Sequence, residues 1–205
     1  MCLGISSASF MVGISYWGHM RCNGARYQGL VLTTAECGKR PRDGLQIHYG
    51  HLNMSQTRTS HVANVQISHD SGIAVLNPEA KLSWSPLSLD IYSTKNYMIG
   101  TQLSMFGWGV RRSLKRRKWL GELSISMFDS SICYDRLGMD VLDEVCTWDK
   151  VSNRFAYHMD KGSALVTKDR TTLVGLKLQT VGLNSPTTFT RIVYYKDWID
   201  STLVS

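Results

Sequence analysis

The sequence predicts an all-β fold, a sandwich or a barrel, followed by a single C-terminal helix. Three observations support this prediction: ten short runs mix β-branched and aromatic residues, turn-forming residues separate these runs, and only the last segment has a helical pattern. Many short strands at such spacing are typical of sandwiches and barrels. The 205 residues are enough for a well-buried core in one domain or in two packed halves.

The expected strands follow one another along the whole chain. A polar, turn-rich stretch near 90–102 separates the first five from the last five and predicts a seam there. A helix is expected at 194–203, where Tyr194, Trp198 and Thr202 share one face. The expected strands are 10–16, 29–34, 45–50, 61–67, 72–76, 103–108, 120–128, 163–167, 172–178 and 188–194.

The composition is that of a globular protein, with 43% hydrophobic and 19% charged residues. No apolar run is long enough for a transmembrane helix, so no membrane partner is expected. The first ten residues lack the basic and apolar regions of a signal peptide. If the protein is secreted, the sequence is a mature form, and whether Met1 is native stays open.

The net charge of +7 is concentrated in one place, residues 111–118, which we call the basic segment. Outside the basic segment, 17 basic residues face 16 acidic ones. The segment therefore carries nearly all of the excess charge. Its six basic residues are Arg111, Arg112, Lys115, Arg116, Arg117 and Lys118.

The five cysteines include no C-x-x-C pair, so a zinc site is not expected. Four of them form two local pairs that would each close a small loop, as in secreted proteins. This leaves Cys2 over, with no role assigned. The expected disulfides are Cys22–Cys37 and Cys133–Cys146.

Two further features bear on ligands and modification. Asn53 begins an Asn-Met-Ser sequon for N-glycosylation, which is consistent with secretion but does not establish that Asn53 is glycosylated. The histidines show no paired spacing, so we expect structural roles for them and neither a metal nor a cofactor.

Four further motifs stand in a fixed order: "CNGARYQGLVLTTAEC" (22–37), "SGIAVL" (71–76), "FGWG" (106–109) and "MDKGSALV" (159–166). Together with the terminal helix they resemble chymotrypsin-like serine proteases of the S1 family over nearly the whole chain. The resemblance implies a chymotrypsin-like double β-barrel with a C-terminal α-helix, as one peptidase S1-like domain over 1–205. It implies an N-terminal barrel at about 1–100, a C-terminal barrel at about 101–193, and the helix at 194–203.

The resemblance places the three catalytic positions of the family on unsuitable residues. The base histidine falls on Glu36, the orienting aspartate on Gly72 and the nucleophilic serine on Lys161. A hydroxyl nucleophile needs an adjacent, oriented base, and here the hydroxyl itself is missing. We therefore expect a vestigial triad without proteolysis, in which Glu36 and Lys161 lie close enough to form an ion pair.

The resemblance also implies that the supporting machinery has changed. Met159 replaces an oxyanion-hole glycine, and methionine resists backbone angles that glycine tolerates. Asp160 stands where the family pairs an aspartate with its N-terminal amine. An occluded specificity pocket is expected from Phe155, Ala156 and Thr187.

Taken together, these features predict a catalytically inactive homologue, or pseudoprotease, that acts by binding proteins. It resembles the inactivated serine protease paralogues of scabies mites, related to the mite group 3 allergens. That resemblance implies secretion and interference with host defence proteins such as complement.

Two alternatives stay open. The basic segment, with Lys39, Arg40 and Arg42 on the same rim, would bind acidic proteins or sulfated glycans; no nucleic-acid partner is expected. A residual hydrolase would need a neutral Lys161, whereas neighbouring carboxylates favour the charged form.

Overall fold

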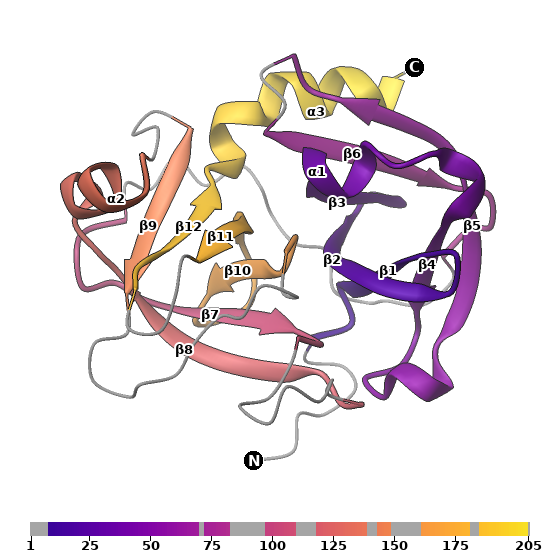
Figure 1. Ribbon diagram of the computed structural model, residues 1–205, viewed down its shortest axis with the longest axis horizontal. Coiled ribbons are helices and arrows are strands. Elements are labelled where there is room, and N and C mark those ends of the chain that lie inside the picture. The colour runs from indigo at the N-terminus through magenta and orange to yellow at the C-terminus, as the bar shows by residue number, and fades with distance from the viewer. Residues whose placement is uncertain are drawn as a thin grey trace.

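Twelve strands in the described part of the chain form two closed antiparallel barrels, shown side by side in Figure 1. The computed structural model describes residues 8–69, 72–82, 97–109, 118–138, 143–148, 161–180 and 185–204. The prediction of an all-β double barrel with a C-terminal helix is confirmed.

The first barrel has the strand order β1-β2-β3-β6-β5-β4. Its two tightest hairpin turns, Trp17–Gly18 and Gln28–Gly29, have positive φ at both positions, the backbone that matches the twist of paired strands. Apolar side chains such as Val12, Val31 and Ile47 fill the interior. The strands are β1 (Met11–Tyr16), β2 (His19–Tyr27), β3 (Leu30–Thr34), β4 (Leu45–Tyr49), β5 (Arg58–Ile67) and β6 (Ile73–Pro78).

The second barrel has the same type of closure, in the order β10-β11-β12-β9-β8-β7. Leu103, Val145 and Phe189 belong to its buried core. The strands are β7 (Gln102–Gly107), β8 (Gly121–Met127), β9 (Glu144–Trp148), β10 (Ala164–Thr167), β11 (Leu173–Thr180) and β12 (Thr187–Thr190).

The terminal helix α3 (Lys196–Val204) confirms the predicted one, but it starts two residues later because a 3₁₀ turn, η5 (Ile192–Tyr195), precedes it. In Figure 1 it lies beside the first barrel, and its Ile199 shares a core cluster with Ile73 of β6. Two shorter 3₁₀ turns, η2 (Arg42–Gly44) and η3 (Met54–Gln56), follow β3 and β4.

Two further helices were not predicted. α1 (Ala35–Gly38) is a single turn, and α2 (Ser130–Leu137) is a surface helix. The signals of α2 are local: the Asp129 carboxylate accepts the N–H of Ser131 at 2.9 Å, and Gly138 ends the helix with φ of 63°. No helix in the described residues is long and apolar enough to cross a membrane.

Candidate functional site

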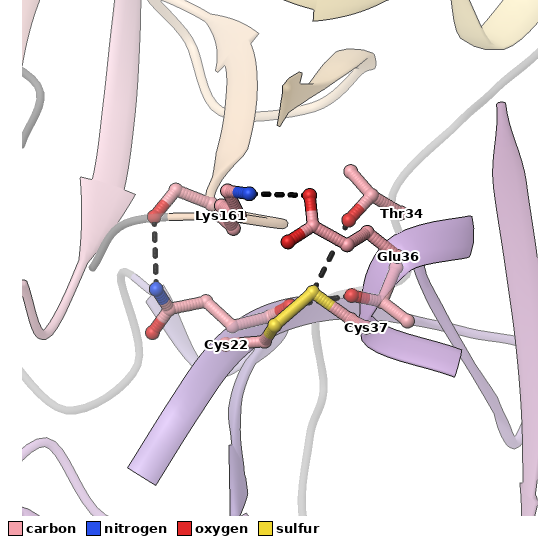
Figure 2. The surroundings of a disulfide bond; sticks show 8 residues. Cys22, Thr34, Glu36, Cys37 and Lys161 are labelled. Carbon is pink, nitrogen blue, oxygen red and sulfur yellow. Dashed lines mark hydrogen bonds and ion pairs between the residues drawn. A yellow bond between two sulfur atoms is a disulfide. The ribbon is translucent and has the colours of Figure 1, made fainter. Parts of the chain in front are cut away.

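Glu36 and Lys161 meet at the junction of the two barrels. Glu36 lies on α1, directly after β3, and Lys161 lies in the turn before β10. The Lys161 ammonium donates to the Glu36 carboxylate, and Figure 2 shows the two side chains pointing at each other. The side chain of Lys161 is 28% exposed and that of Glu36 is 65% exposed. The predicted ion pair is therefore confirmed, and it lies at the surface.

Three contacts fix the position of α1. A disulfide joins Cys22 of β2 to Cys37, and the Thr34 hydroxyl donates to the Cys37 sulfur at 3.1 Å (Figure 2). The N–H of Ala35 donates to the carbonyl of Gly72 at 3.4 Å. Glu36 therefore extends from a short helix that is attached to both β2 and the start of β6. The structure also joins Cys133 to Cys146; Cys2 lies outside the described residues.

The turn that carries Lys161 is held by Asn23 of β2. The Asn23 N–H donates to the Lys161 carbonyl at 2.7 Å, and its side-chain amide donates to the Ser163 hydroxyl at 3.1 Å. Gly162 has φ of 74°, and a Cβ there would lie 2.0 Å from the Asn23 carbonyl oxygen. Only glycine fits at 162, so backbone contacts between the barrels determine where Lys161 points.

Gly72 faces a tyrosine. A Cβ at residue 72 would lie 1.9 Å from the hydroxyl oxygen of Tyr195. Tyr195 is buried, and its hydroxyl donates to the Asp143 carboxylate at 2.8 Å. The space that a side chain at 72 would need is therefore occupied. Sequence reasoning noticed the glycine but missed Tyr195, which only the folded chain brings next to it.

The predicted pocket is only partly described. Thr187 is buried on β12, and its hydroxyl lies 2.9 Å from that of Thr180. Lys177 of β11 is fully buried. It lies next to the Lys161 turn, where its backbone N–H donates to the Ser163 carbonyl at 2.9 Å. Sequence reasoning missed Lys177, although a lysine within the apolar run "LVGLKL" is a visible signal. Phe155, Ala156, Met159 and Asp160 lie outside the described residues.

Of the basic segment, only Lys118 is described. It is exposed, and its carbonyl accepts the N–H of Met54 at 2.8 Å. The other members, Arg111, Arg112, Lys115, Arg116 and Arg117, lie outside the described residues.

A second basic surface, which we call the hairpin patch, consists of Tyr16, Trp17, Lys39, Arg40 and Arg42. Trp17 is 66% exposed, and its ring centroid lies 6.0 Å from that of Tyr16. The Arg40 guanidinium lies 5.3 Å from the Tyr16 ring centroid. The backbone N–H of Trp17 donates to the Gly44 carbonyl at 2.9 Å, which ties the β1–β2 turn to η2. The sequence indicated the three cations but not the tryptophan.

Part of this charge is available to a partner. Arg42 donates to the Ala63 carbonyl at 2.9 Å and lies 3.7 Å from the Asp43 carboxylate. Within the described part of the chain, Lys39 and Arg40 have no ion-pair partner. Lys39 follows α1, so the hairpin patch begins one helical turn from Glu36.

The described residues hold no group of three His, Cys, Asp or Glu side chains arranged for a metal ion. The site therefore consists of the surface ion pair between Glu36 and Lys161, the hairpin patch beside it, and Gly72 in close contact with Tyr195.

Comparison with known proteins gives the family. A structure of human heparin-binding protein has a TM-score of 0.84 at 19% identity, over 100% of this chain and 96% of that one. An atomic-resolution structure of HBP has the same TM-score at 18% identity and the same coverage. No curated protein matches the sequence. The sequence profile of the trypsin family matches residues 4–199. The chain therefore belongs to the trypsin family.

Proposed function

We propose that this protein is a catalytically inactive member of the trypsin family that acts by binding other molecules. The observation that carries the proposal is the ion pair between Lys161 and Glu36. Acyl transfer in this family needs a hydroxyl and a neutral base within hydrogen-bond reach of it. An ammonium and a carboxylate at these positions supply neither a hydroxyl nor a neutral base.

The surroundings of Gly72 support the same proposal. An orienting carboxylate at 72 would have to displace the Tyr195 hydroxyl, which is itself bonded to Asp143. Returning an aspartate to this position would therefore disturb the core around Tyr195.

A covalent serine-hydrolase probe and a small activated ester test the inactivity, with trypsin as the positive control. We expect neither labelling nor turnover for the natural chain, and none for the Glu36→His/Lys161→Ser double variant, in which Gly72 is unchanged. Ester turnover that disappears in Lys161→Met would show that Lys161 takes part in hydrolysis, and it would overturn the proposal.

We propose that this protein is secreted and that its partners are host defence proteins such as complement components. The resemblance to inactivated scabies-mite paralogues suggests this class, and the two disulfides are compatible with an extracellular protein. A pull-down from host plasma tests it, using the immobilised protein and an equally basic, unrelated protein as control. Complement components retained only by this protein would support the proposal.

A second candidate function, binding of a sulfated glycan, rests on the hairpin patch. Its arginines and lysine suit sulfate groups, and an exposed indole such as Trp17 suits the apolar face of a sugar ring. The name of the structural neighbour, heparin-binding protein, points in the same direction.

Elution from immobilised heparin tests this candidate. Trp17→Ala and the Lys39→Ala/Arg40→Ala pair should elute at clearly lower salt than the natural chain. Lys168→Ala removes an exposed lysine in the β10–β11 turn of the other barrel and is the matched control. If Lys168→Ala lowers the eluting salt as much as the patch variants do, binding follows net charge alone and no glycan site exists at the patch.

A further inference from the structure

The chain contains a single Asn-X-Ser/Thr sequon, Asn53–Met54–Ser55. It occupies the connection between β4 and β5, where Ser55 and Gln56 are exposed and η3 forms a tight turn. We propose that Asn53 carries an N-linked glycan whose first sugar packs on Trp119. The proposal rests on secretion, which is part of the proposed function, and it does not depend on the state of Glu36 and Lys161.

The local geometry leaves one atom of the Asn53 side chain available. Its carbonyl oxygen accepts the N–H of Ser55 at 3.1 Å and the Ser55 hydroxyl at 2.8 Å. The amide nitrogen, Nδ2, donates to no residue in the described part of the chain. The hydroxyl that the sequon requires therefore bonds to the oxygen, while the nitrogen that receives the sugar meets no acceptor among the residues that the structure describes.

The attachment is a group transfer from a lipid-linked oligosaccharide pyrophosphate, catalysed by the transferase of the secretory pathway. A bond forms between Nδ2 and C1 of the first sugar, and the bond between C1 and the pyrophosphate oxygen breaks. The lipid pyrophosphate leaves with that electron pair. One Nδ2 proton passes to a base of the transferase, so no oxidant or reductant is needed.

Trp119 lies directly across from the sequon. Asn53 and Trp119 form an antiparallel bridge, flanked by hydrogen bonds from Met54 to the Lys118 carbonyl and from Leu120 to the Leu52 carbonyl, each 2.8 Å. Residues opposite each other in such a bridge place their side chains next to each other. Trp119 is 56% exposed, which leaves it accessible to the first sugar.

His51 completes the platform. Its ring centroid lies 6.0 Å from that of Trp119, and its Nδ1 accepts the N–H of Asn53 at 2.9 Å. The backbone around Asn53 is thus held by His51 on its own strand connection and by residues 118 and 120 across the bridge. Because Lys118 belongs to the basic segment, a glycan here would also stand at one end of that segment.

Secretion from eukaryotic cells tests the attachment. Treatment with peptide N-glycosidase should lower the apparent mass of the natural chain, and peptide mapping should place the modification at residue 53. Asn53→Gln and Ser55→Ala should lose the shift, whereas Ser55→Thr should keep it. Asn77→Gln changes an exposed asparagine outside any sequon and should also keep it.

A secreted natural chain with an unmodified residue 53, from cells that glycosylate a reference protein, would overturn the attachment. If Asn53→Gln is not secreted, peptide mapping of the natural chain decides alone.

The packing on Trp119 has its own test. Trimming the glycan to one sugar should leave a higher Tm than that of Asn53→Gln, because the sugar covers the indole. In Trp119→Ala this gain in Tm should be lost. An equal gain with and without Trp119 would contradict the packing. Hydrolysis assays of Asn53→Gln should match those of the natural chain, so a failure of the attachment is distinguishable from a failure of the proposed inactivity.

Discussion

The hydroxyl oxygen of Tyr195 lies 1.9 Å from the place that a Cβ of residue 72 would occupy. The φ of Gly72 is not in the left-handed region, so its backbone conformation does not require glycine. The contact with the buried Tyr195 is what leaves no room for a side chain at residue 72. The tyrosine is held in turn by Asp143, at 2.8 Å. This relationship links the start of β6 to η5, near the end of the chain.

Gly72→Ala should lower the free energy of unfolding by roughly 1–3 kcal/mol, the usual cost of overpacking. Tyr195→Phe removes the atom that lies closest, so the alanine should cost less in that background. Urea denaturation of the two single variants and the double variant measures this coupling. If the two effects simply add, the contact between residue 72 and Tyr195 is not what excludes a side chain.

The Glu36–Lys161 pair should contribute little to stability although it occupies the centre of the site. Glu36 is 65% exposed, and solvent screens exposed ion pairs to about 0–1 kcal/mol. A double-mutant cycle with Glu36→Gln and Lys161→Gln should give a coupling within that range. A coupling above about 2 kcal/mol would mean that the pair is much better shielded than its exposure indicates.

Loss of the Cys22–Cys37 disulfide should be far more costly. The bridge spans 15 residues and joins β2 to α1, so replacing both cysteines by serine should cost about 3 kcal/mol. Chemical denaturation without reductant measures the loss. The Cys133–Cys146 bridge spans 13 residues and provides the comparison, with a similar expected cost. A negligible cost for both pairs would contradict the loop-closure argument.

His48 should make the protein less stable in mild acid. Burial lowers the pKa of His48 below its ordinary value of 6.5, while its ring nitrogens contact Ser15 and Thr57. Below about pH 6.5 the unfolded chain therefore binds a proton at this histidine that the folded chain binds less well, and stability falls as pH decreases.

The slope of unfolding free energy against pH is measured from pH 7.5 to pH 5. Comparing this slope between the natural chain and His48→Gln isolates the effect of His48. His48→Gln should have a shallower slope than the natural chain, whatever its absolute stability. His61→Gln, which changes an exposed histidine on the neighbouring strand, is the matched control for the substitution itself.

The basic segment should affect binding without affecting the fold. Replacing Arg116, Arg117 and Lys118 by alanine should weaken binding to an anionic partner and reduce its salt dependence. The reason is that screening shortens charge interactions from about 10 Å at 0.1 M salt to about 3 Å at 1 M. Unchanged affinity at both salt concentrations would show that the segment is not part of the binding surface.

The order of motifs along the chain was sufficient to predict the fold, because each motif marks a strand end or a turn. It did not reveal β2, since Asn23 and Gly24 are residue types that strands disfavour. Gly24 is nevertheless required there: a Cβ would lie 2.9 Å from the Leu32 carbonyl oxygen. Such requirements depend on the neighbouring strand and cannot be seen in a single segment.

The site was predicted only in part. Glu36 and Lys161 could be paired in advance because each belongs to a recognisable motif. Tyr195 could not, because its contact with residue 72 joins segments far apart in the sequence. The apolar run around Lys177 could have predicted its burial, but not its backbone bond to Ser163. The occluded pocket at Phe155 and the division into barrels at about residue 100 stay predictions, since they fall wholly or partly outside the described residues.

Asn23 has a consequence for the order of assembly. It bonds to Trp108 and Ser163, which lie 85 and 140 residues further along the chain. During synthesis on the ribosome, β2 is therefore finished long before the partners of Asn23 emerge. Until then its amide lacks both of these partners, and the face of the first barrel that will meet the second stays open. Newly made chains released before residue 163 should therefore be the species most prone to aggregate.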